Sequence, residues 1–182
     1  MNVFEAVQAR RSIRSYLDKP VSEEKLERIL EAARLAPSAR NAEPWHFITV
    51  TDAEKRKILS KGLYAKFVAQ APLVIVACAN KKASPDWYAV DTALAVENLI
   101  LAAVGEGLGT CCVDTFDQKE VAELLIVPDE FEVLLLVTVG YPSEKCDLTS
   151  KLDHLVRPRK LLSEIASVEE FGRKFIPEKI EL

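Results

Sequence analysis

Apolar residues spaced three or four apart predict amphipathic helices, each with one face turned toward a core. The first of these helices is expected over Asn2–Ala9. The others are expected from Ser22 to the residues before Pro37, from Thr51 onward, over Asp86–Val104, and from Asp117 to about Leu125. Between these helices, short apolar runs are more typical of β-strands.

The predicted strands lie at Trp45–Val50, Leu73–Ala79, Thr110–Val113 and Glu132–Val139. The second and the last of these runs are continuously apolar, which is the pattern of strands buried on both faces. No internal repeat, low-complexity run or linker separates the elements. We therefore expect one domain over residues 1–182, with helices covering both faces of a sheet.

Polar residues at the expected helix starts predict caps. Ser22 precedes two glutamates, which are favourable at the positive end of the helix dipole. Thr51 and Glu54 have the spacing of a capping box, and Ser84-Pro85 offers a cap followed by a proline at the first helical position. The helix after Pro85 is apolar nearly all round, which indicates a core or an oligomer interface.

Composition and charge exclude several classes of protein. The chain has 182 residues of which 49% are hydrophobic, enough to form a core, so disorder is not expected. Its 24 basic and 28 acidic residues give a net charge of −4, so we expect no nucleic-acid partner. The most apolar stretch, Ala93–Val104, falls short of the roughly 18 residues that span a bilayer, and we expect no membrane partner. No signal peptide or disulfide framework is evident, which favours the cytoplasm.

A basic motif after the first helix is the strongest candidate for ligand binding. Residues two apart in an extended chain point to the same side, so Arg10, Ser12 and Arg14 would share one face. Guanidinium groups and a hydroxyl suit a phosphate, whose oxygens accept charge-assisted hydrogen bonds. A solvated basic turn is the alternative, and the residues alone leave both open. A second basic group, Arg157-Pro158-Arg159-Lys160, would complete a phosphate clamp if the two groups meet.

A polar loop between Pro37 and Pro44 is the second candidate. Its Ser38 and Asn41 side chains could hydrogen-bond either a ligand or the turns of the loop itself. Trp45, directly after the loop, is interpreted as a core residue rather than a platform for a cofactor.

Glycine, cysteine and histidine patterns argue against other chemistries. The Gly105–Thr110 run follows a helix and precedes a strand, the reverse of a dinucleotide-binding motif, so its glycines should end the helix and allow a close backbone approach. Cys111 and Cys112 are adjacent on a strand and face opposite sides, which favours buried reduced thiols. His46 and His154 are too few for a metal site or a catalytic triad.

Taken in order, four motifs resemble those of the nitroreductase family of FMN-dependent oxidoreductases. They are Arg10-Arg11-Ser12-Ile13-Arg14, Pro37-Ser38-x-x-Asn41-x-x-Pro44-Trp45-His46-Phe47, Gly107-Leu108-Gly109-Thr110 and Gly140-Tyr141-Pro142. The resemblance runs from residue 2 to about residue 165. It implies an α+β homodimer whose central mixed sheet of four to five strands is flanked by helices, with two FMN sites at the subunit interface. The Asp86–Val104 helix would form the dimer contact, and a tail over about residues 166–182 would wrap around the partner.

The resemblance also implies which residues bind the cofactor. The FMN phosphate and ribityl chain would be held by Arg10, Arg11, Ser12 and Arg14, with Arg157 and Arg159 completing the phosphate site. The loop residues that would reach the flavin of the partner subunit are Pro37, Ser38 and Asn41. The strand residues that would pass along the isoalloxazine ring are Cys112, Val113 and Asp114. The segment between Lys61 and Ala71 offers no firm contact for the pyrimidine edge of the flavin.

These motifs together predict an enzyme that takes a hydride from NADH or NADPH through bound FMN and reduces a small-molecule acceptor. Nitroaromatics, quinones and free flavin are the acceptors that the resemblance suggests. The cofactor carries the chemistry, so no catalytic side chain and no metal is expected. A flavin-binding sensor or storage protein without turnover is the alternative. A thiol-redox protein using Cys111 or Cys112 is a further rival.

Overall fold

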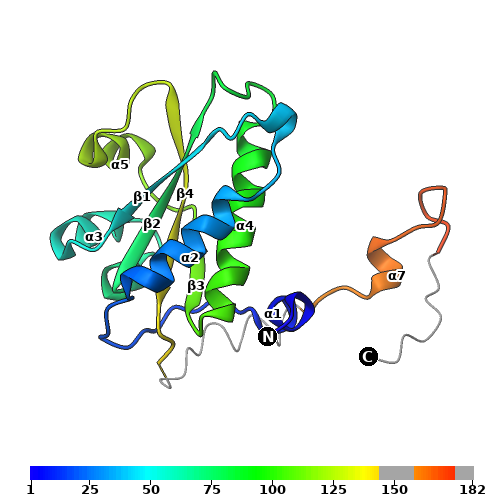
Figure 1. Ribbon diagram of the computed structural model, residues 1–182, viewed down its shortest axis with the longest axis horizontal. Helices are drawn as coiled ribbons and strands as arrows, with labels where there is room; N and C mark the ends of the chain where they lie inside the picture. The colour runs from blue at the N-terminus through cyan, green and yellow to red at the C-terminus, as the bar shows by residue number, and fades with distance from the viewer. Residues whose placement is uncertain (144–157, 175–182) are drawn as a thin grey trace. The chain divides into compact units, whose positions relative to one another are not determined.

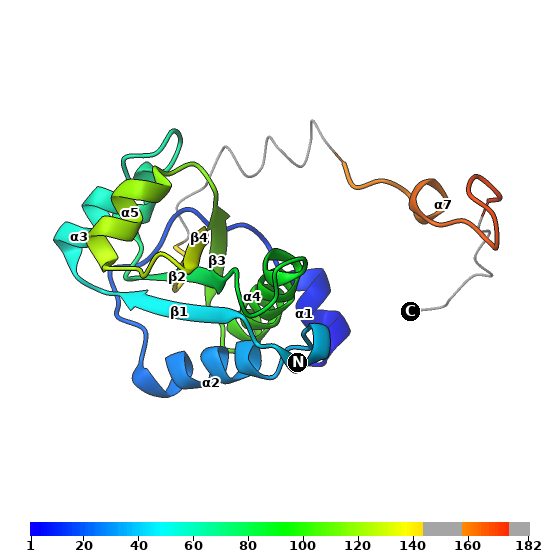
Figure 2. The same cartoon turned by 90° about the horizontal axis from the view of Figure 1, so that it is seen from above.

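The computed structural model describes residues 1–143 and 158–174, which fall into two units divided after Cys146. The first unit holds a four-stranded sheet with helices packed on both faces (Figures 1 and 2). The helices on one face are α2 (Glu23–Arg34) and α4 (Tyr88–Gly105), and those on the other are α3 (Ala53–Leu59) and α5 (Gln118–Leu125). The expected α+β arrangement is confirmed.

The strands are β1 (Trp45–Val50), β2 (Leu73–Asn80), β3 (Gly109–Val113) and β4 (Phe131–Gly140). Each end lies within one residue of its expected position. The strands stand in the order β1-β2-β4-β3, and every neighbouring pair is antiparallel. The mixed sheet that the resemblance implies is therefore wrong for these four strands. Their burial on both faces does not decide strand direction, because antiparallel strands between two helical layers are buried in the same way. A parallel pairing occurs as an isolated bridge between Ser12 and Thr110.

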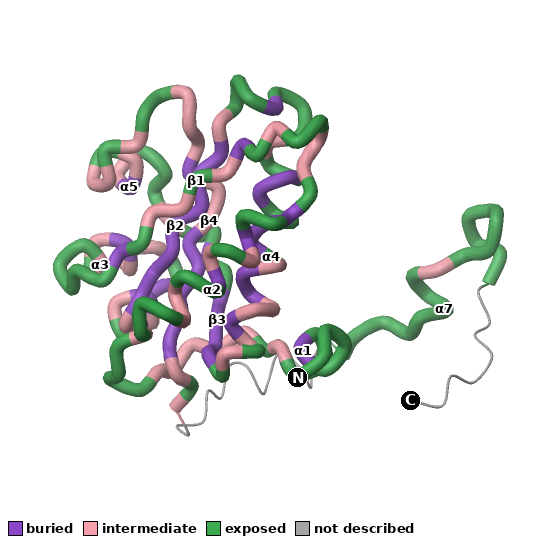
Figure 3. The backbone as a smooth tube through the Cα atoms, in the orientation of Figure 1, coloured by how far each residue is buried: buried purple, intermediate pink, exposed green. Residues whose placement is uncertain are grey.

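Strand β2 contributes to both hydrophobic cores because its side chains alternate between the two faces of the sheet. Leu73 and Ile75 belong to the core beneath α2 and α4, whereas Val74 and Val76 belong to the core beneath α3 and α5. Each residue from Leu73 to Ala79 is buried, and Figure 3 shows β2 at the centre of the first unit. Burying one large apolar side chain is worth about 1.5–3 kcal/mol, so this strand contributes much of the driving force for folding.

Among the described residues, four helices begin at side-chain caps, and three of these caps lie at the starts expected from the sequence. Asn2 accepts a hydrogen bond at the start of α1 (Val3–Ala9), Ser22 does so at α2, and Asp117 does so at α5. Glu5 completes a capping box with Asn2. The first turns of these helices are therefore stabilised by local contacts as well as by packing.

Two helix starts differ from the expectation. Asp52, not Thr51, caps α3, and its side chain accepts from the Lys55 N–H at 2.8 Å. Threonine and aspartate are both good caps and are adjacent here, so the sequence does not decide at which of the two residues the helix starts. Ser84 does not cap α4, which begins at Tyr88, because its hydroxyl donates instead to the Asp91 carboxylate at 2.9 Å.

Helix α4 has one buried side and one exposed apolar side. Ala95 and Leu99 lie in the core, whereas Val90 and Leu94 are 49% and 44% exposed. By length and composition α4 is able to cross a membrane, contrary to our estimate of the longest apolar stretch. Its contacts with α2 and the sheet are those of a core helix, and the absence of a membrane partner stays a prediction.

The second unit is described over residues 158–174. It contains the short helix α7 (Leu162–Ile165) and a turn closed by an isolated bridge between Ser167 and Lys174. Leu161, Ile165 and Phe171 are exposed. The last part of the expected tail, residues 175–182, lies outside the described residues, so a single domain over the whole chain and the wrapping of a partner both stay predictions.

Candidate functional site

The basic motif Arg10–Arg14 lies in an extended segment, as expected, and the structure places this segment beside β3. Ser12 pairs with Thr110 in parallel orientation, and the Ile13 N–H donates to the Thr110 carbonyl at 2.8 Å. Further along, Tyr16 pairs with Pro142. The segment is therefore fastened to β3 and to the residues after β4, which gives its side chains a fixed place beside the sheet.

Gly109 permits the segment to approach β3 closely. A Cβ atom at Gly109 would lie 2.6 Å from Cγ1 and 2.8 Å from Cβ of Ile13. Contacts of that length do not occur between real side chains, so glycine is required for Ile13 to sit where it does. Gly107 has a φ of 72°, a conformation that favours glycine, and it follows the end of α4. The expected roles of these glycines are confirmed.

The three arginines of the motif have different surroundings. The Arg11 guanidinium is exposed and donates to the carbonyls of Gln8 and Arg10 at 2.6 and 2.8 Å, so it satisfies the end of α1. The Arg14 guanidinium lies 6.0 Å from the centre of the Phe67 ring, within reach of a cation–π interaction. Arg10 is partly buried and close enough to Cys112 to lower the pKa of its thiol. Arg10 and Arg14 thus stand near β3 and near η2 (Lys66–Gln70), respectively.

The predicted ring-contacting residues lie at the end of strand β3. Val113 is buried in the core beneath α3 and α5, so its side chain does not face a ligand at this strand end. Cys112 and Asp114 are exposed. Neighbouring atoms nevertheless desolvate the Cys112 thiol, and this effect, with smaller electrostatic effects of Cys111, Glu97 and Asp114, raises its pKa to about 11 against the opposite effect of Arg10. The thiol is therefore protonated at neutral pH, which argues against the thiol-redox rival.

The segment from Lys61 to Phe67 lies beside the end of β3, a proximity that the sequence did not reveal. A Cβ at Gly62 would lie 1.4 Å from the Thr115 carbonyl oxygen, and the Thr115 hydroxyl donates to the Leu63 carbonyl at 2.7 Å. Tyr64 has a φ of 62° and is exposed. This segment therefore borders the same region as Arg14 and Asp114. Gly62 was the available signal in the sequence, but a glycine alone does not indicate which residue lies against it.

The loop between Pro37 and Pro44 is held by its own hydrogen bonds. The Ser38 hydroxyl accepts from the Glu43 N–H at 3.0 Å, and the Asn41 amide donates to the Glu43 carboxylate at 2.9 Å. The loop contains the 3-10 turn η1 (Ala39–Asn41), in which Asn41 has a φ of 54°. The sequence left open whether Ser38 and Asn41 stabilise the loop or bind a ligand. In the structure both side chains stabilise the loop, and these hydrogen bonds also fix their positions.

Asp91 anchors this loop to α4, and sequence reasoning missed it. Its carboxylate is 3% exposed and accepts from the Ala39 N–H at 3.0 Å and from the Ser84 hydroxyl at 2.9 Å. A carboxylate in the first turn of a largely apolar helix was the signal that could have identified it, because buried polar groups require hydrogen-bond partners.

One chain does not bring the two candidate segments together. The loop contacts Asp91 in the first turn of α4, whereas Ser12 pairs with Thr110, which follows the end of that helix. Asp91 and Gly105 are separated by about 20 Å along the helix at 1.5 Å per residue. Figure 1 shows the loop after α2 near one end of α4 and the chain after α1 near the other. Arg157 lies outside the described residues, and Arg159 is exposed in the second unit, so their phosphate contacts stay predictions.

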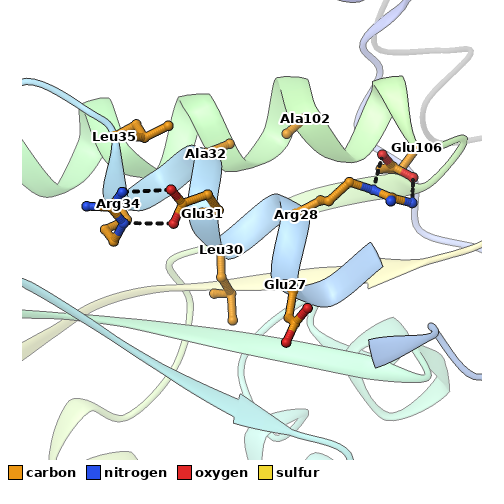
Figure 4. A pocket seen from close by; sticks show the side chains of 9 residues that line it. All are labelled: Glu27, Arg28, Leu30, Glu31, Ala32, Arg34, Leu35, Ala102 and Glu106. Carbon is orange, nitrogen blue, oxygen red and sulfur yellow. Dashed lines mark hydrogen bonds and ion pairs between the residues drawn. The ribbon is translucent and has the colours of Figure 1, made fainter. Parts of the chain in front are cut away.

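A shallow groove between α2 and the second half of α4 is not part of either segment (Figure 4). Its lining includes Leu30 and Ala102, and its rim carries exposed ion pairs, such as Arg28 with Glu106 at 2.7 Å. Across residues 1–143 and 158–174, no three His, Cys, Asp or Glu residues are grouped so that they could hold a metal ion.

The sequence and the fold were compared with known proteins. The chain matches the nitroreductase family over residues 7–62 and 58–141. It is 39% identical to a putative NADH dehydrogenase/NAD(P)H nitroreductase of Archaeoglobus fulgidus, over 78% of this chain and 86% of that protein. It is 31% identical to an FMN reductase [NAD(P)H] of Bacillus subtilis, over 79% of this chain and 67% of that protein.

A solved structure agrees with this assignment. An FMN-dependent nitroreductase from Clostridium difficile R20291 is 32% identical, covers 92% of this chain with 99% of its own length, and superposes with a TM-score of 0.79. The motifs, the fold and these matches lead to one conclusion: the chain belongs to the nitroreductase family and is an NAD(P)H oxidoreductase of that family.

Proposed function

We propose that this enzyme binds FMN with its phosphate against Arg10, Ser12 and Arg14. NADH or NADPH would reduce the bound FMN, which would then pass the reducing equivalents to a small-molecule acceptor. The observation that carries the proposal is the extended segment fastened beside β3, which holds two guanidinium groups and a hydroxyl next to the Cys112–Asp114 strand end. The names of the relatives, one an FMN reductase and one an FMN-dependent nitroreductase, support the same cofactor.

The residues present fit the chemical parts of FMN. A phosphate dianion is matched by arginine donors, which bind its oxygens through two parallel hydrogen bonds. The flat ring system would lie over the backbone from Cys112 to Asp114, where Val113 turns its own side chain into the core. FMN supplies hydride transfer when it is bound. The chain's part is to hold the phosphate, fix the ring and leave one ring face open to the donor and then to the acceptor.

We also propose that two copies of the chain complete each site. Ser38 lines an apolar hollow together with Trp87, which precedes α4, and with Val90 and Leu94 of the exposed side of that helix. A second copy seated here would bring its Arg10–Arg14 segment toward the Pro37–Pro44 loop, which one chain alone keeps apart.

Leu94→Glu is expected to convert the proposed dimer into a monomer. Burying an unpaired carboxylate in an apolar interface costs several kcal/mol, so the dimer dissociation constant should rise about 100-fold or more. Sedimentation velocity at micromolar concentration measures the change. The control Ile126→Glu alters an exposed apolar residue after α5 and should leave the mass unchanged. A wild-type chain that sediments as a monomer with bound FMN would contradict the proposed dimer.

A flavin-binding sensor is the alternative function, and turnover distinguishes the two. The enzyme should oxidise many equivalents of NADH or NADPH per FMN when a soluble quinone is supplied as a general acceptor. A sensor would bind FMN and consume about one equivalent at most. Steady-state oxidation of the nucleotide, followed by absorbance at a known concentration of bound FMN, measures the difference.

A further inference from the structure

We infer that Tyr16 is a positioning residue for the phosphate-binding segment and acts through the backbone of Ile13. This inference rests on the proposed FMN site. The Tyr16 hydroxyl donates to the Ile13 carbonyl and lies 2.6 Å from the Thr138 hydroxyl. Thr138 is fully buried in β4, and its hydroxyl donates to the Cys111 carbonyl of β3 at 3.2 Å. One side chain therefore links the basic segment to two strands of the sheet.

Ile13 is held at both of its backbone groups. Its N–H donates to the Thr110 carbonyl at 2.8 Å, and its carbonyl accepts from Tyr16. The first group belongs to the peptide unit shared with Ser12, and the second belongs to the unit shared with Arg14. Because peptide units are planar, fixing both of them sets φ and ψ of Ile13 and thereby the positions of the Ser12 and Arg14 Cα atoms relative to each other. The spacing from which the Ser12 and Arg14 side chains start is then fixed. These are two of the three side chains assigned to the phosphate.

The ring of Tyr16 is seated independently of its hydroxyl. A Cβ at Gly140 would lie 2.9 Å from Cδ1 of Tyr16 and 2.6 Å from Cδ of Pro72, so the three residues are in close contact. Burial raises the pKa of Tyr16 above its ordinary value, and the hydroxyl keeps its hydrogen throughout the neutral range. Tyr16→Phe should therefore retain the ring position and remove the hydrogen bonds of the hydroxyl alone.

The hydrogen atoms of the two hydroxyl groups determine which contact Tyr16→Phe removes. Tyr16 and Thr138 have one hydroxyl hydrogen each, and the two carbonyls of Ile13 and Cys111 accept them, so the close contact between the two hydroxyl oxygens has no hydrogen of its own. Without the Tyr16 hydroxyl, Thr138 still has its hydrogen for the Cys111 carbonyl. The pairing of β3 with β4 stays satisfied, and the Ile13 carbonyl loses its Tyr16 donor. The effect should then be confined to the basic segment.

The test compares FMN with riboflavin, which lacks the phosphate, in the whole chain freed of flavin. Dissociation constants are measured by quenching of flavin fluorescence, with folding of each variant checked by circular dichroism. Tyr16→Phe should weaken FMN binding about tenfold and leave riboflavin binding within about twofold, because a segment that is no longer held at Ile13 must be ordered when it binds the phosphate. The ³¹P NMR resonance of bound FMN should shift in this variant.

Tyr141→Phe is the matched control, because it removes a hydroxyl directly after Gly140 and leaves the hydrogen bonds of Ile13 intact. The ring of Tyr141 contacts Lys19 and Lys25, whose amino groups lie 4.3 and 5.2 Å from its centre, and the phenylalanine keeps that ring. This control should bind both ligands as the wild-type chain does and leave the ³¹P resonance in place.

Four results would overturn the inference. Unchanged FMN affinity in Tyr16→Phe would remove the link between Tyr16 and the phosphate, and equal weakening of FMN and riboflavin would indicate a general structural role. Thr138→Val provides a second variant, in which Tyr16 still donates to Ile13, so FMN affinity should stay within about twofold. A tenfold loss there would contradict the route through Ile13. A wild-type chain that fails to bind FMN would instead overturn the proposed function, and this inference with it.

Discussion

Replacing Arg10 and Arg14 together with alanine is expected to abolish FMN binding at micromolar cofactor. A charge-assisted hydrogen bond is worth about 1.5–3 kcal/mol, so two lost arginine contacts should weaken binding about 10²- to 10⁴-fold. The fold should persist, because Arg10 is partly buried outside both hydrophobic cores and the contact of Arg14 with Phe67 contributes only about 0.5–1 kcal/mol. The measurement is a fluorescence titration of the flavin-free variant with FMN.

The matched control for this variant is Arg28→Ala with Arg34→Ala. Both arginines are exposed on α2 and form ion pairs with glutamates, so their removal changes the net charge equally without touching the basic segment. The control should bind FMN with wild-type affinity. Retention of FMN by the Arg10 and Arg14 double variant would contradict the phosphate site.

Gly109→Ala is expected to damage both the fold and the cofactor site. The added Cβ would lie 2.6 Å from Ile13, so either β3 or the basic segment has to move. Overpacking of this kind costs about 1–3 kcal/mol, which corresponds to a fall in melting temperature of about 2–12 °C. Because Ile13 joins Ser12 to Arg14, its displacement should also weaken FMN binding. Thermal unfolding and the same FMN titration measure the two effects.

Gly105→Ala controls for the loss of a glycine nearby. A Cβ at Gly105 meets no atom within 4 Å, and this residue is the last of α4. Alanine is favoured over glycine in helices by up to about 1 kcal/mol, so stability should be unchanged or slightly higher. Equal stability and equal FMN affinity in both alanine variants would show that the close approach at Gly109 is not required.

The sequence predicted the elements well where the signals are local. Continuous apolar runs located β2 and β4 to within one residue at each end, and the caps at Ser22 and Asp117 located two helix starts. Strand direction was not predictable in this way, because burial on both faces is common to parallel and antiparallel strands in a layered fold. Ser84 was misassigned as a cap because its hydroxyl binds Asp91, seven residues away, in preference to the helix start.

The candidate site was predictable as a motif but not as an arrangement. The spacing of Arg10, Ser12 and Arg14 is visible in the sequence, since residues two apart share a face in extended chain. The partners that fix this segment are distant along the chain. Thr138, for example, is 122 residues from Tyr16, and no periodicity links the two. Such contacts depend on the strand order, which local patterns do not specify.

The most direct test of the central claim is the visible absorption spectrum of the purified whole chain, reconstituted with FMN, before and after anaerobic addition of NADH or NADPH. We expect a bound flavin spectrum with one FMN for each chain, which bleaches when one of the two nucleotides is added. That result would establish both the cofactor and its reduction by a nicotinamide. A chain that takes up no FMN, or one whose bound flavin stays oxidised with both nucleotides, would contradict the proposed function.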